Sequence, residues 1–439
     1  MTALAASILA GDSAIEHVVV RLTHTLGRKW RWLKPLAERY VSRFGNGVRP
    51  RRNDVEEFLR SDRGLKRVFE KYFDEISVST RLVEAQQMQP VAAATTWPVP
   101  AIESAGSLAD WLHLSESELE WFADLKGLQS KSDRQGTSSK LTHYYYRTLA
   151  KKYGSLRLIE EPKPHLKQIQ RQILSDILDC IPTHPAAHGF VKGLSIQTFA
   201  APHVGRRVVL RMDLKDFFPS FAARRIQAFF RTAGYPESVA NLLGGLCTNA
   251  APRSIWKEAG TGIDGSLLTQ ARNLYSRPHL PQGAPTSPAL ANVCAYRIDC
   301  RLSGLAQAAG AAYTRYADDL AFSGDEDFEK CVERFAVHVA AILAEEGFSV
   351  HHRKTRIMRQ GVRQYLAGLV ANQRVNIVRA DFDRLKATLH NCIRHGLESQ
   401  NREAHPCFRS HLQGRVGFVE MINPEKGRRL RGLLEQISW

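Results

Sequence analysis

Apolar residues recur at helical spacing in two stretches between residues 14 and 86. Residues three and four apart lie on one face of an α-helix, so this pattern predicts helices with one buried face. The polar positions between the two stretches are strongly basic, which fits either a solvated helix face or a surface that contacts RNA or DNA. The apolar positions are Ile15, Val18, Val19, Leu22, Val55, Phe58, Leu59, Leu65, Val68 and Phe69. The basic positions are Arg28, Lys29, Arg31, Lys34, Arg49, Arg51 and Arg52.

The helical pattern then gives way to a segment with neither periodicity nor charge. Residues 86–100 contain three prolines and three consecutive alanines, which is typical of a linker. A short helical module is predicted next, from Ser107 to Gly127, with Ser107 capping its first helix and the pair Ser115 and Glu118 capping its second. The module's predicted core is Trp111, Leu112, Leu119, Trp121 and Phe122. The polar residues 130–139 predict a loop.

From residue 141 onward, strand patterns alternate with helix patterns. The β-rich runs are Tyr144 to Tyr146, Val208 to Asp213 and a hairpin from Ala311 to Ser323. The helix patterns are Ser220 to Ala233, Pro288 to Leu305, Asp327 to Glu346 and much of 379–439. This alternation predicts an α+β fold, in which an antiparallel sheet carries helices on one face.

Three aspartates stand where the apolar flanks predict strands. Asp213 lies in the segment Arg211 to Phe218, and Asp318 and Asp319 are adjacent in Tyr313 to Leu320. A pair of aspartates is most often a solvated turn. Here, however, an apolar run follows the pair directly, and buried acids are costly unless a cation is present. Three converging carboxylates would suit two divalent cations about 3.5–4 Å apart, the arrangement used for in-line phosphoryl transfer. Mg²⁺ suits such a site, with Mn²⁺ as a substitute.

Six blocks in a fixed order resemble reverse transcriptases, and among them the bacterial retron type. The resemblance covers roughly residues 145–430 and implies a right-hand polymerase, with fingers, a palm built on an antiparallel sheet and a helical thumb. The blocks are Arg157 to Pro162 with Leu166 to Gln170, His188-Gly189-Phe190, the Asp213 block, Leu280 to Pro288, Tyr316-Ala317-Asp318-Asp319, and Gly347-Phe348 to Lys354-Thr355.

The sequence patterns and the resemblance together predict the domain boundaries. The patterns place a basic helical N-terminal extension at residues 1–88, a linker at 89–103, and the short helical module and loop at 104–140, and the resemblance implies the boundaries that follow. The fingers would occupy residues 141–207, with an insertion at about 221–287 inside the palm at 208–370. The helical thumb would occupy residues 371–439.

The same resemblance implies roles for individual residues. Asp213, Asp318 and Asp319 would be the catalytic metal ligands. Phe218 would pack under the sugar and favour dNTP over rNTP, although a phenylalanine is ordinarily a core residue. Gln282 and Gly283 would line the nucleotide pocket unless they form only a proline-framed turn. Arg157 would hold the triphosphate, and Lys354 would lie near the leaving pyrophosphate. Arg315 could instead pair with one acid as a structural salt bridge.

A retron-type enzyme implies particular partners. These are a noncoding RNA that serves as both template and primer, its branched DNA product, dNTPs, and a separate effector in phage defence. Two retron elements have imperfect counterparts here, at Asn249 to Arg253 and at Leu366-Ala367-Gly368. A reverse transcriptase of another bacterial lineage, related to abortive-infection or group II intron enzymes, is therefore an alternative. A non-catalytic RNA-binding scaffold is a further one.

Composition agrees with a partner that carries phosphate. The 439 residues have a formal net charge of +17, which favours a polyanion, and 44% hydrophobic residues, enough for sizeable cores. We expect no membrane partner and a cytoplasmic protein, because the sequence has no long apolar stretch and no signal peptide pattern. The seven scattered cysteines predict buried thiols in a reducing compartment. His390, Cys392 and His395 lack a fourth ligand, so we do not expect a zinc site there.

Overall fold

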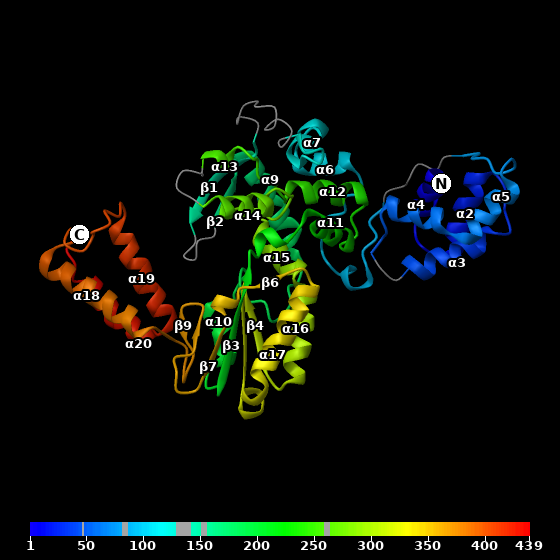
Figure 1. Ribbon diagram of the computed structural model, residues 1–439. Helices are drawn as coiled ribbons and strands as arrows, with labels where there is room; N and C mark the ends of the chain where they lie inside the picture. The colour runs from blue at the N-terminus through cyan, green and yellow to red at the C-terminus, as the bar shows by residue number, and fades with distance from the viewer. Residues whose placement is uncertain (46–47, 81–86, 129–141, 151–155, 259–263) are drawn as a thin grey trace. The chain divides into compact units, whose positions relative to one another are not determined.

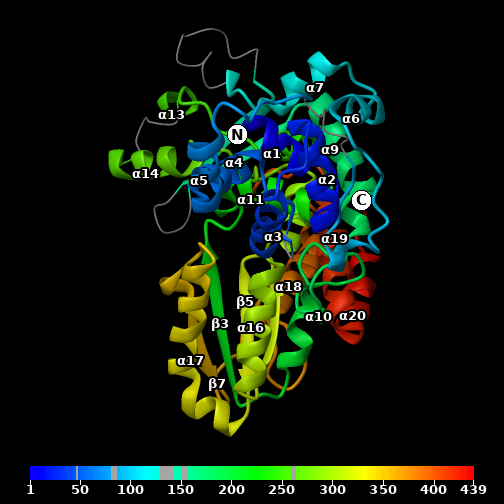
Figure 2. The same cartoon turned by 90° about the vertical axis from the view of Figure 1, so that its right-hand side faces the viewer.

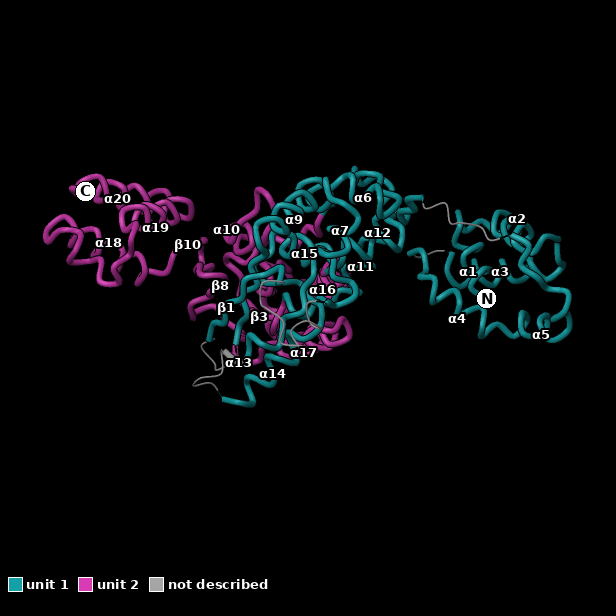
Figure 3. The backbone as a smooth tube through the Cα atoms, turned by 90° about the horizontal axis from the view of Figure 1, so that it is seen from above, with its two compact units in different colours: residues 1–182, 218–294 teal, residues 183–217, 295–439 magenta. Residues whose placement is uncertain are grey.

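Two units, each built from two separate stretches of chain, make up the computed structural model (Figure 3). Residues 1–182 and 218–294 form the first unit, and residues 183–217 and 295–439 form the second. The structure describes residues 1–45, 48–80, 87–128, 142–150, 156–258 and 264–439. The loop predicted over residues 130–139 lies outside the described residues.

The N-terminal part of the first unit consists of helices around an apolar core. They are α1 (Thr2–Leu9), α2 (Ile15–Leu26), α3 (Leu33–Phe44), α4 (Arg52–Ser61) and α5 (Arg63–Tyr72). The core includes Leu22, Leu36, Tyr40 and Leu59, each at most 1% exposed. The helical prediction is confirmed, with two differences. Helix α1 was not predicted, and the described residues 73–80 are not helical.

The short helical module is also present. After a turn of 3₁₀ helix at Ala92–Ala94, it contains α6 (Ala105–Leu112) and α7 (Glu116–Ala123). The capping box of Ser115 and Glu118 is confirmed, but Ser104 caps α6 and Ser107 hydrogen-bonds back to it. The core prediction holds fully for Leu112 and Leu119, whereas Trp111, Trp121 and Phe122 are only half-buried.

The rest of the first unit combines a two-stranded antiparallel sheet with helices (Figure 1). Strand β1 (Tyr144–Ala150) pairs with β2 (Leu156–Pro162). The helices are α9 (Pro164–Asp176), α11 (Ala223–Thr232), α12 (Glu237–Leu246), α13 (Ile255–Glu258), α14 (Gly265–Tyr275) and α15 (Ser287–Cys294), with 3₁₀ turns at Leu178–Cys180 and Phe218–Ser220. The single helix predicted from Pro288 to Leu305 is wrong, because α15 ends at Cys294 and α16 (Tyr296–Ala308) belongs to the second unit.

A five-stranded antiparallel sheet is the centre of the second unit. Strand β3 (Val208–Lys215) pairs with β5 (Asp319–Gly324), which pairs with β4 (Ala312–Tyr316). On its other edge, β3 pairs with β6 (Ser349–Val350) and with β7 (Arg356–Arg359). The remaining elements near the sheet are α10 (Ile196–Ala200), a 3₁₀ turn η4 (Ala201–His203), α17 (Glu326–Glu345) and a 3₁₀ turn η6 (His352–Lys354). The α+β prediction is confirmed at this level.

Side chains alternate between the two faces of this sheet. Phe322 packs edge-on against Phe335 of α17, and α16 and α17 run along this face (Figure 2). The other face carries Val209 and Ala321, which belong to an apolar cluster with Phe199. Because Arg211 and Asp213 follow Val209 at a spacing of two, they lie on this second face, away from α17.

The chain ends in short strands and helices. Strands β8 (Tyr365–Leu366), β9 (Leu369–Val370) and β10 (Asn376–Ile377) form a small antiparallel sheet. Helices α18 (Arg379–His395), α19 (Phe408–Ile422) and α20 (Pro424–Leu434) follow, as predicted for this region. Within the described part of the chain, no helix combines the length and the apolar character needed to cross a bilayer.

All seven cysteines are free thiols, but the prediction that they are buried is wrong for some of them. Cys247, Cys294 and Cys392 are buried, whereas Cys300 and Cys407 are exposed and the other two are half-buried. The odd number and scattered spacing had excluded a disulfide framework but carried no signal for the burial of each thiol.

Candidate active site

Strand pairing brings Asp213 and Asp319 together. They are direct partners in the register between β3 and β5, although 106 positions separate them in the sequence. Direct partners in an antiparallel pair have their Cβ atoms about 4.5–5.5 Å apart and share one face of the sheet. Asp213 is buried, with 4% of its surface exposed. The convergence of these two acids, predicted from their apolar flanks, therefore follows from the register of the sheet.

Asp318 lies in the two-residue turn that joins β4 to β5. The preceding residue, Ala317, has a φ of +54°, as the first position of a tight hairpin turn requires. The Asp318 carbonyl accepts a hydrogen bond of 2.9 Å from the Leu214 amide, which ties the turn to β3. Burial, and then repulsion from Asp213 and Asp319, raise the pKa of Asp318 to about 6. The three acids therefore interact electrostatically, as a shared site requires.

Two cations neutralise part of this charge. The Lys354 ammonium donates to both carboxylate oxygens of Asp213, at 2.9 and 2.8 Å. The Arg211 guanidinium donates to Asp319, with Nη2 at 2.7 Å from Oδ1. Lys354 was predicted to belong to the site, but Arg211 was not. Its spacing of two from Asp213, which places both on one face of a strand, was the signal available in the sequence.

The three acids fit divalent cations by their chemistry. Carboxylate oxygens are the ligands that Mg²⁺ prefers, and Mg²⁺ is usually held by one or two carboxylates with water and substrate phosphates completing the shell. Within the described ranges, no group of three or more His, Cys, Asp or Glu side chains is arranged to hold a metal ion, and this holds for Asp213, Asp318 and Asp319 as well. As the side chains stand, Lys354 and Arg211 engage two of the three carboxylates.

Arg315 supports the hairpin from inside the protein. Its guanidinium is fully buried and pairs with Asp299 of α16 at 2.6 Å. It also donates to the Ala317 carbonyl at 3.3 Å, so that one side chain fixes both the strand and the turn. The structural salt bridge considered for Arg315 is therefore present, and its partner is Asp299 rather than one of the three acids.

The segment His188-Gly189-Phe190 packs against the same hairpin. The His188 amide donates to the Arg315 carbonyl, and the Arg315 amide donates to the Ala186 carbonyl, each at 2.7 Å. A Cβ added to Gly189 would lie 2.6 Å from the Ala317 nitrogen, closer than any side chain could approach. Only glycine fits here. The sequence block that resembled a polymerase motif therefore positions the turn that carries Asp318.

Gln282 and Gly283 lie in the first unit, on a loop that contacts β2. The Gln282 carbonyl accepts from the Glu160 amide at 2.9 Å. Gly283 has a φ of +138°, and a Cβ there would lie 2.8 Å from the Glu160 carbonyl oxygen. Glu160 is itself buried. Its carboxylate pairs with the His279 ring at 2.9 Å and accepts a hydrogen bond from the side-chain amide of Asn249 at 2.8 Å. The loop is thus rigidly held, as a pocket wall or a structural turn would both require.

The two other predicted residues also lie in the first unit. Arg157 is an exposed residue of β2, and Phe218 is half-buried at the start of a 3₁₀ turn. Phe218 is therefore not fully buried, as a core phenylalanine would be. The roles of both residues remain predictions.

Comparison with known proteins identifies the family. A family model described as reverse transcriptase (RNA-dependent DNA polymerase) matches residues 149–376. The retron Mx65 reverse transcriptase of Myxococcus xanthus is 42% identical over 298 residues, which are 66% of this chain and 64% of that protein. The retron Mx162 enzyme of the same organism is 37% identical, over 77% of this chain and 67% of that protein.

A third relative comes from another organism. The retron Ec86 reverse transcriptase of Escherichia coli is 32% identical over 63% of this chain and 74% of that protein. The chain spans less than two thirds of the Mx65 protein's own length. The family model covers more than half of the chain, and its matched range contains Asp213, Asp318 and Asp319. On this basis the chain belongs to the reverse transcriptase family, in its retron branch.

Proposed function

We propose that this chain is an RNA-directed DNA polymerase of the retron type, with Asp213, Asp318 and Asp319 as its catalytic metal ligands. The observation that carries the proposal is the pairing of Asp213 with Asp319 across β3 and β5, with Asp318 in the adjoining turn. Two Mg²⁺ ions, or Mn²⁺ in their place, would stabilise charge at the phosphorus and activate the attacking oxygen.

The side chains around the acids have complementary roles in this proposal. Lys354 and Arg211 balance the acids' charge before substrate binds, because each already donates to one carboxylate. A cation at Lys354 can then neutralise or protonate the leaving pyrophosphate. Arg315 and Gly189 hold the turn so that Asp318 keeps its position, and such preorganisation is the protein's main contribution to phosphoryl transfer.

The remaining predicted residues would bind the nucleotide. Phe218 would exclude a ribose 2′-hydroxyl, Gln282 and Gly283 would line the pocket, and Arg157 would hold the triphosphate. In this proposal residues 141–207 serve as fingers, 208–370 as palm with an insertion at about 221–287, and 371–439 as thumb. The antiparallel sheet with α16 and α17 on one face supports the palm assignment.

We further propose the partners that the family implies. A structured noncoding RNA would be both template and primer, and the product would be single-stranded DNA joined to that RNA by a 2′,5′ branch. A separate effector would act with them in phage defence. The net charge of +17 supports an RNA partner, since cationic surfaces gain affinity by releasing counterions from phosphates.

Extension of a DNA primer on an RNA template tests the proposed activity. The wild-type chain should add dNTPs in the presence of Mg²⁺ and discriminate against rNTPs. The variant Asp318→Asn/Asp319→Asn should lose most of this activity. The matched control is Asp325→Asn/Asp327→Asn, which removes two acids from exposed positions at the start of α17. Equal extension by both double variants would refute the proposed site.

Sequencing of nucleic acid that copurifies with the protein tests the retron branch of the proposal. A single structured RNA with branched DNA is the expected result. Untemplated or protein-primed DNA would instead indicate a reverse transcriptase of another bacterial lineage. RNA without DNA, from a protein that also fails the extension assay, would indicate a non-catalytic scaffold.

A further inference from the structure

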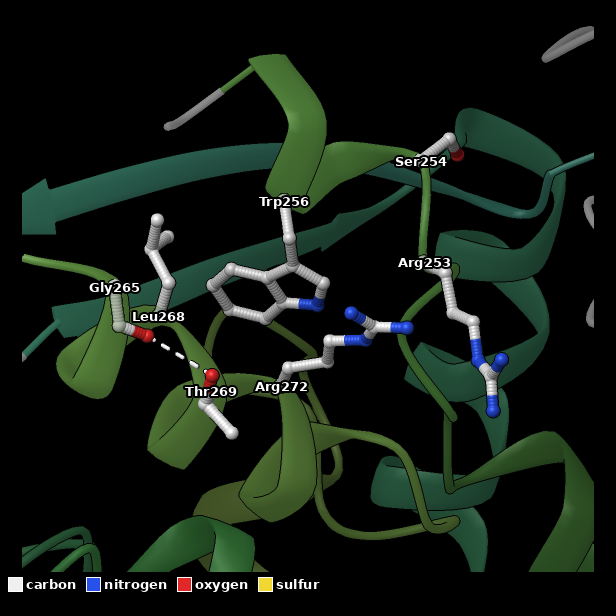
Figure 4. A pocket seen from close by; sticks show the side chains of 7 residues that line it. All are labelled: Arg253, Ser254, Trp256, Gly265, Leu268, Thr269 and Arg272. Carbon is white, nitrogen blue, oxygen red and sulfur yellow. Dashed lines mark hydrogen bonds between the residues drawn. The ribbon is translucent and has the colours of Figure 1, made fainter. Parts of the chain in front are cut away.

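A pocket of about 480 Å³ lies in the first unit between α13 and α14, outside the site described above. The loop before α13 contributes Arg253 and Ser254, and α13 contributes Trp256 (Figure 4). Helix α14 contributes Gly265, Leu268, Thr269 and Arg272. These four positions follow the spacing i, i+3, i+4 and i+7, so they lie on one face of α14, and that face lines the pocket.

Gly265 lines the pocket at the first turn of α14. An added Cβ at Gly265 would have no atom of the described residues within 4 Å, so these residues leave space beside the first turn of α14. Glycine is a poor helix former, and any larger residue would narrow the pocket at this point. The Thr269 hydroxyl donates to the Gly265 carbonyl at 2.9 Å, which leaves its own oxygen able to accept a hydrogen bond from a ligand.

Trp256 forms the floor of the pocket. Only 6% of its surface is exposed, and it packs in a cluster with Leu158, Ala271 and Tyr275, its ring lying 5.8 Å from that of Tyr275. A tryptophan so buried is ordinarily only a core residue. Here, however, part of the indole borders the pocket, with the Arg272 side chain beside it (Figure 4). The floor is therefore a rigid aromatic surface next to a cation.

The loop that carries Arg253 is held in place by the main chain. The Asn249 and His279 amides each donate to the other residue's carbonyl, at 2.9 and 3.0 Å, and the Ala251 amide donates to the Tyr275 carbonyl at 2.9 Å. Arg253 follows two residues after this anchor. The imperfect counterpart of a retron element, Asn249 to Arg253, therefore ends at the pocket and places a guanidinium on its rim.

The charged side chains that line the pocket are all cationic. Arg253 and Arg272 are both exposed, and none of the lining residues is acidic. Arg272 forms no ion pair with any carboxylate that the structure describes. Two guanidinium groups next to an indole favour a ligand with both phosphate and a flat ring, because arginine binds phosphate in a bidentate manner and aromatic side chains stack on bases.

We propose that this pocket binds an unpaired nucleotide of a single-stranded nucleic acid. The phosphate would lie between Arg253 and Arg272, and the base would contact the exposed part of Trp256. A base within a duplex cannot reach the indole, because its ring faces are covered by neighbouring base pairs. The inference rests on the proposed function only in that the chain handles nucleic acid, and it adds a contact site apart from the three acids.

Binding of fluorescent oligo(U), oligo(dT) and a blunt RNA duplex tests this inference with the full-length chain. Arg253→Gln/Arg272→Gln removes the charge, and Gly265→Leu fills the pocket without altering charge. Each variant should weaken binding of a single strand about tenfold, and the charge variant should also reduce the slope of log affinity against log salt by about 1. Duplex affinity should change much less. Whichever single strand is affected identifies the strand that the pocket binds.

The matched control is Arg171→Gln/Arg334→Gln, which removes two exposed cations from α9 and α17. The inference would be overturned if both pocket variants bound single strands as tightly as this control does. It would also be overturned if the pocket variants lost as much affinity for the duplex as for single strands. Primer extension by the wild-type chain is measured in parallel. Extension with unaffected binding refutes only the pocket, whereas absent extension refutes the proposed polymerase function.

Discussion

At the scale of single residues, the ionised side chain of Asp318 destabilises the fold that carries it. Asp318 is held close to two other carboxylates, and burial with their repulsion raises its pKa from 3.8 to about 6. An acid whose pKa is raised on folding binds its proton more tightly in the folded state, so stability falls as the pH rises through this window. The negative charge of Asp318 thus lowers the stability of the metal-free protein.

Asp318→Asn should therefore stabilise the metal-free protein at neutral pH. One pKa unit corresponds to about 1.4 kcal/mol, so the gain in the free energy of unfolding should be about 1–3 kcal/mol. Denaturant unfolding in the presence of a chelator measures it. The gain should vanish below pH 3.8, where Asp318 is protonated in both states. The control Asp74→Asn changes an exposed acid, and an equal gain there would contradict this explanation.

The burial of His203 predicts the opposite dependence of stability on pH. Its Nε2 lies 2.7 Å from the Thr314 hydroxyl, which itself donates to the Phe199 carbonyl, so Nε2 must be the donor to Thr314. Its Nδ1 then accepts from Ser323 at 2.7 Å. Burial lowers the pKa of this neutral histidine from 6.5 to about 3. The unfolded chain takes up the proton first, so stability should be lost as the pH falls below 6.5.

The loss attributable to His203 should reach at most about 1.4 kcal/mol per pH unit between pH 6.5 and pH 5. Unfolding curves across this range should show that the free energy of unfolding depends less steeply on pH for His203→Asn than for the wild-type chain. His338→Asn, which changes an exposed histidine of α17, should retain the wild-type slope. Identical slopes for all three proteins would exclude His203 as the source.

At the scale of elements, the hairpin of β4 and β5 depends on a contact with a distant segment. Gly189 lies against the peptide between Tyr316 and Ala317. Gly189→Ala should destabilise the protein by about 1–3 kcal/mol, because the clashing atoms belong to the backbone and cannot rotate away. Nucleotide addition should slow as well, since the turn carries Asp318. Thermal unfolding and primer extension measure the two effects.

Gly304→Ala is the matched control for this change. Gly304 lies in α16, and a Cβ there would have no atom of the described chain within 4 Å. Alanine is the better helix former, so this variant should be as stable as the wild type or slightly more stable. A Gly189→Ala variant that behaves like Gly304→Ala would show that the close contact does not position the hairpin.

The elements also show what the sequence could and could not predict. Period-two and helical patterns identified β3, the hairpin, α17 and the C-terminal helices, because each buries a continuous apolar face. The break between α15 and α16 was missed, since no proline or glycine marks it at Ala295. Of the side chains that meet at the site, the three acids and Lys354 were predicted. Arg211 and Gly189 acquire their roles only through contacts with residues far along the chain, which a local pattern does not encode.

At the scale of the whole molecule, charge should control the affinity for nucleic acid. With a net charge of +17, the chain should bind RNA mainly through phosphate contacts. The logarithm of affinity should then fall linearly with the logarithm of salt concentration, with a slope of about −0.7 per contacted phosphate on single strands. Titrations at several salt concentrations measure this slope. An affinity that is indifferent to salt would contradict a phosphate-based interface.

The rate of nucleotide addition by Asp318→Asn is the measurement that tests the central claim most directly. This variant is expected to be more stable than the wild type without metal, so a loss of activity could not be attributed to unfolding. We predict that it adds dNTPs to a primer on an RNA template at least about a hundredfold more slowly than the wild-type chain. A rate equal to that of the wild type would contradict the assignment of this carboxylate to catalysis.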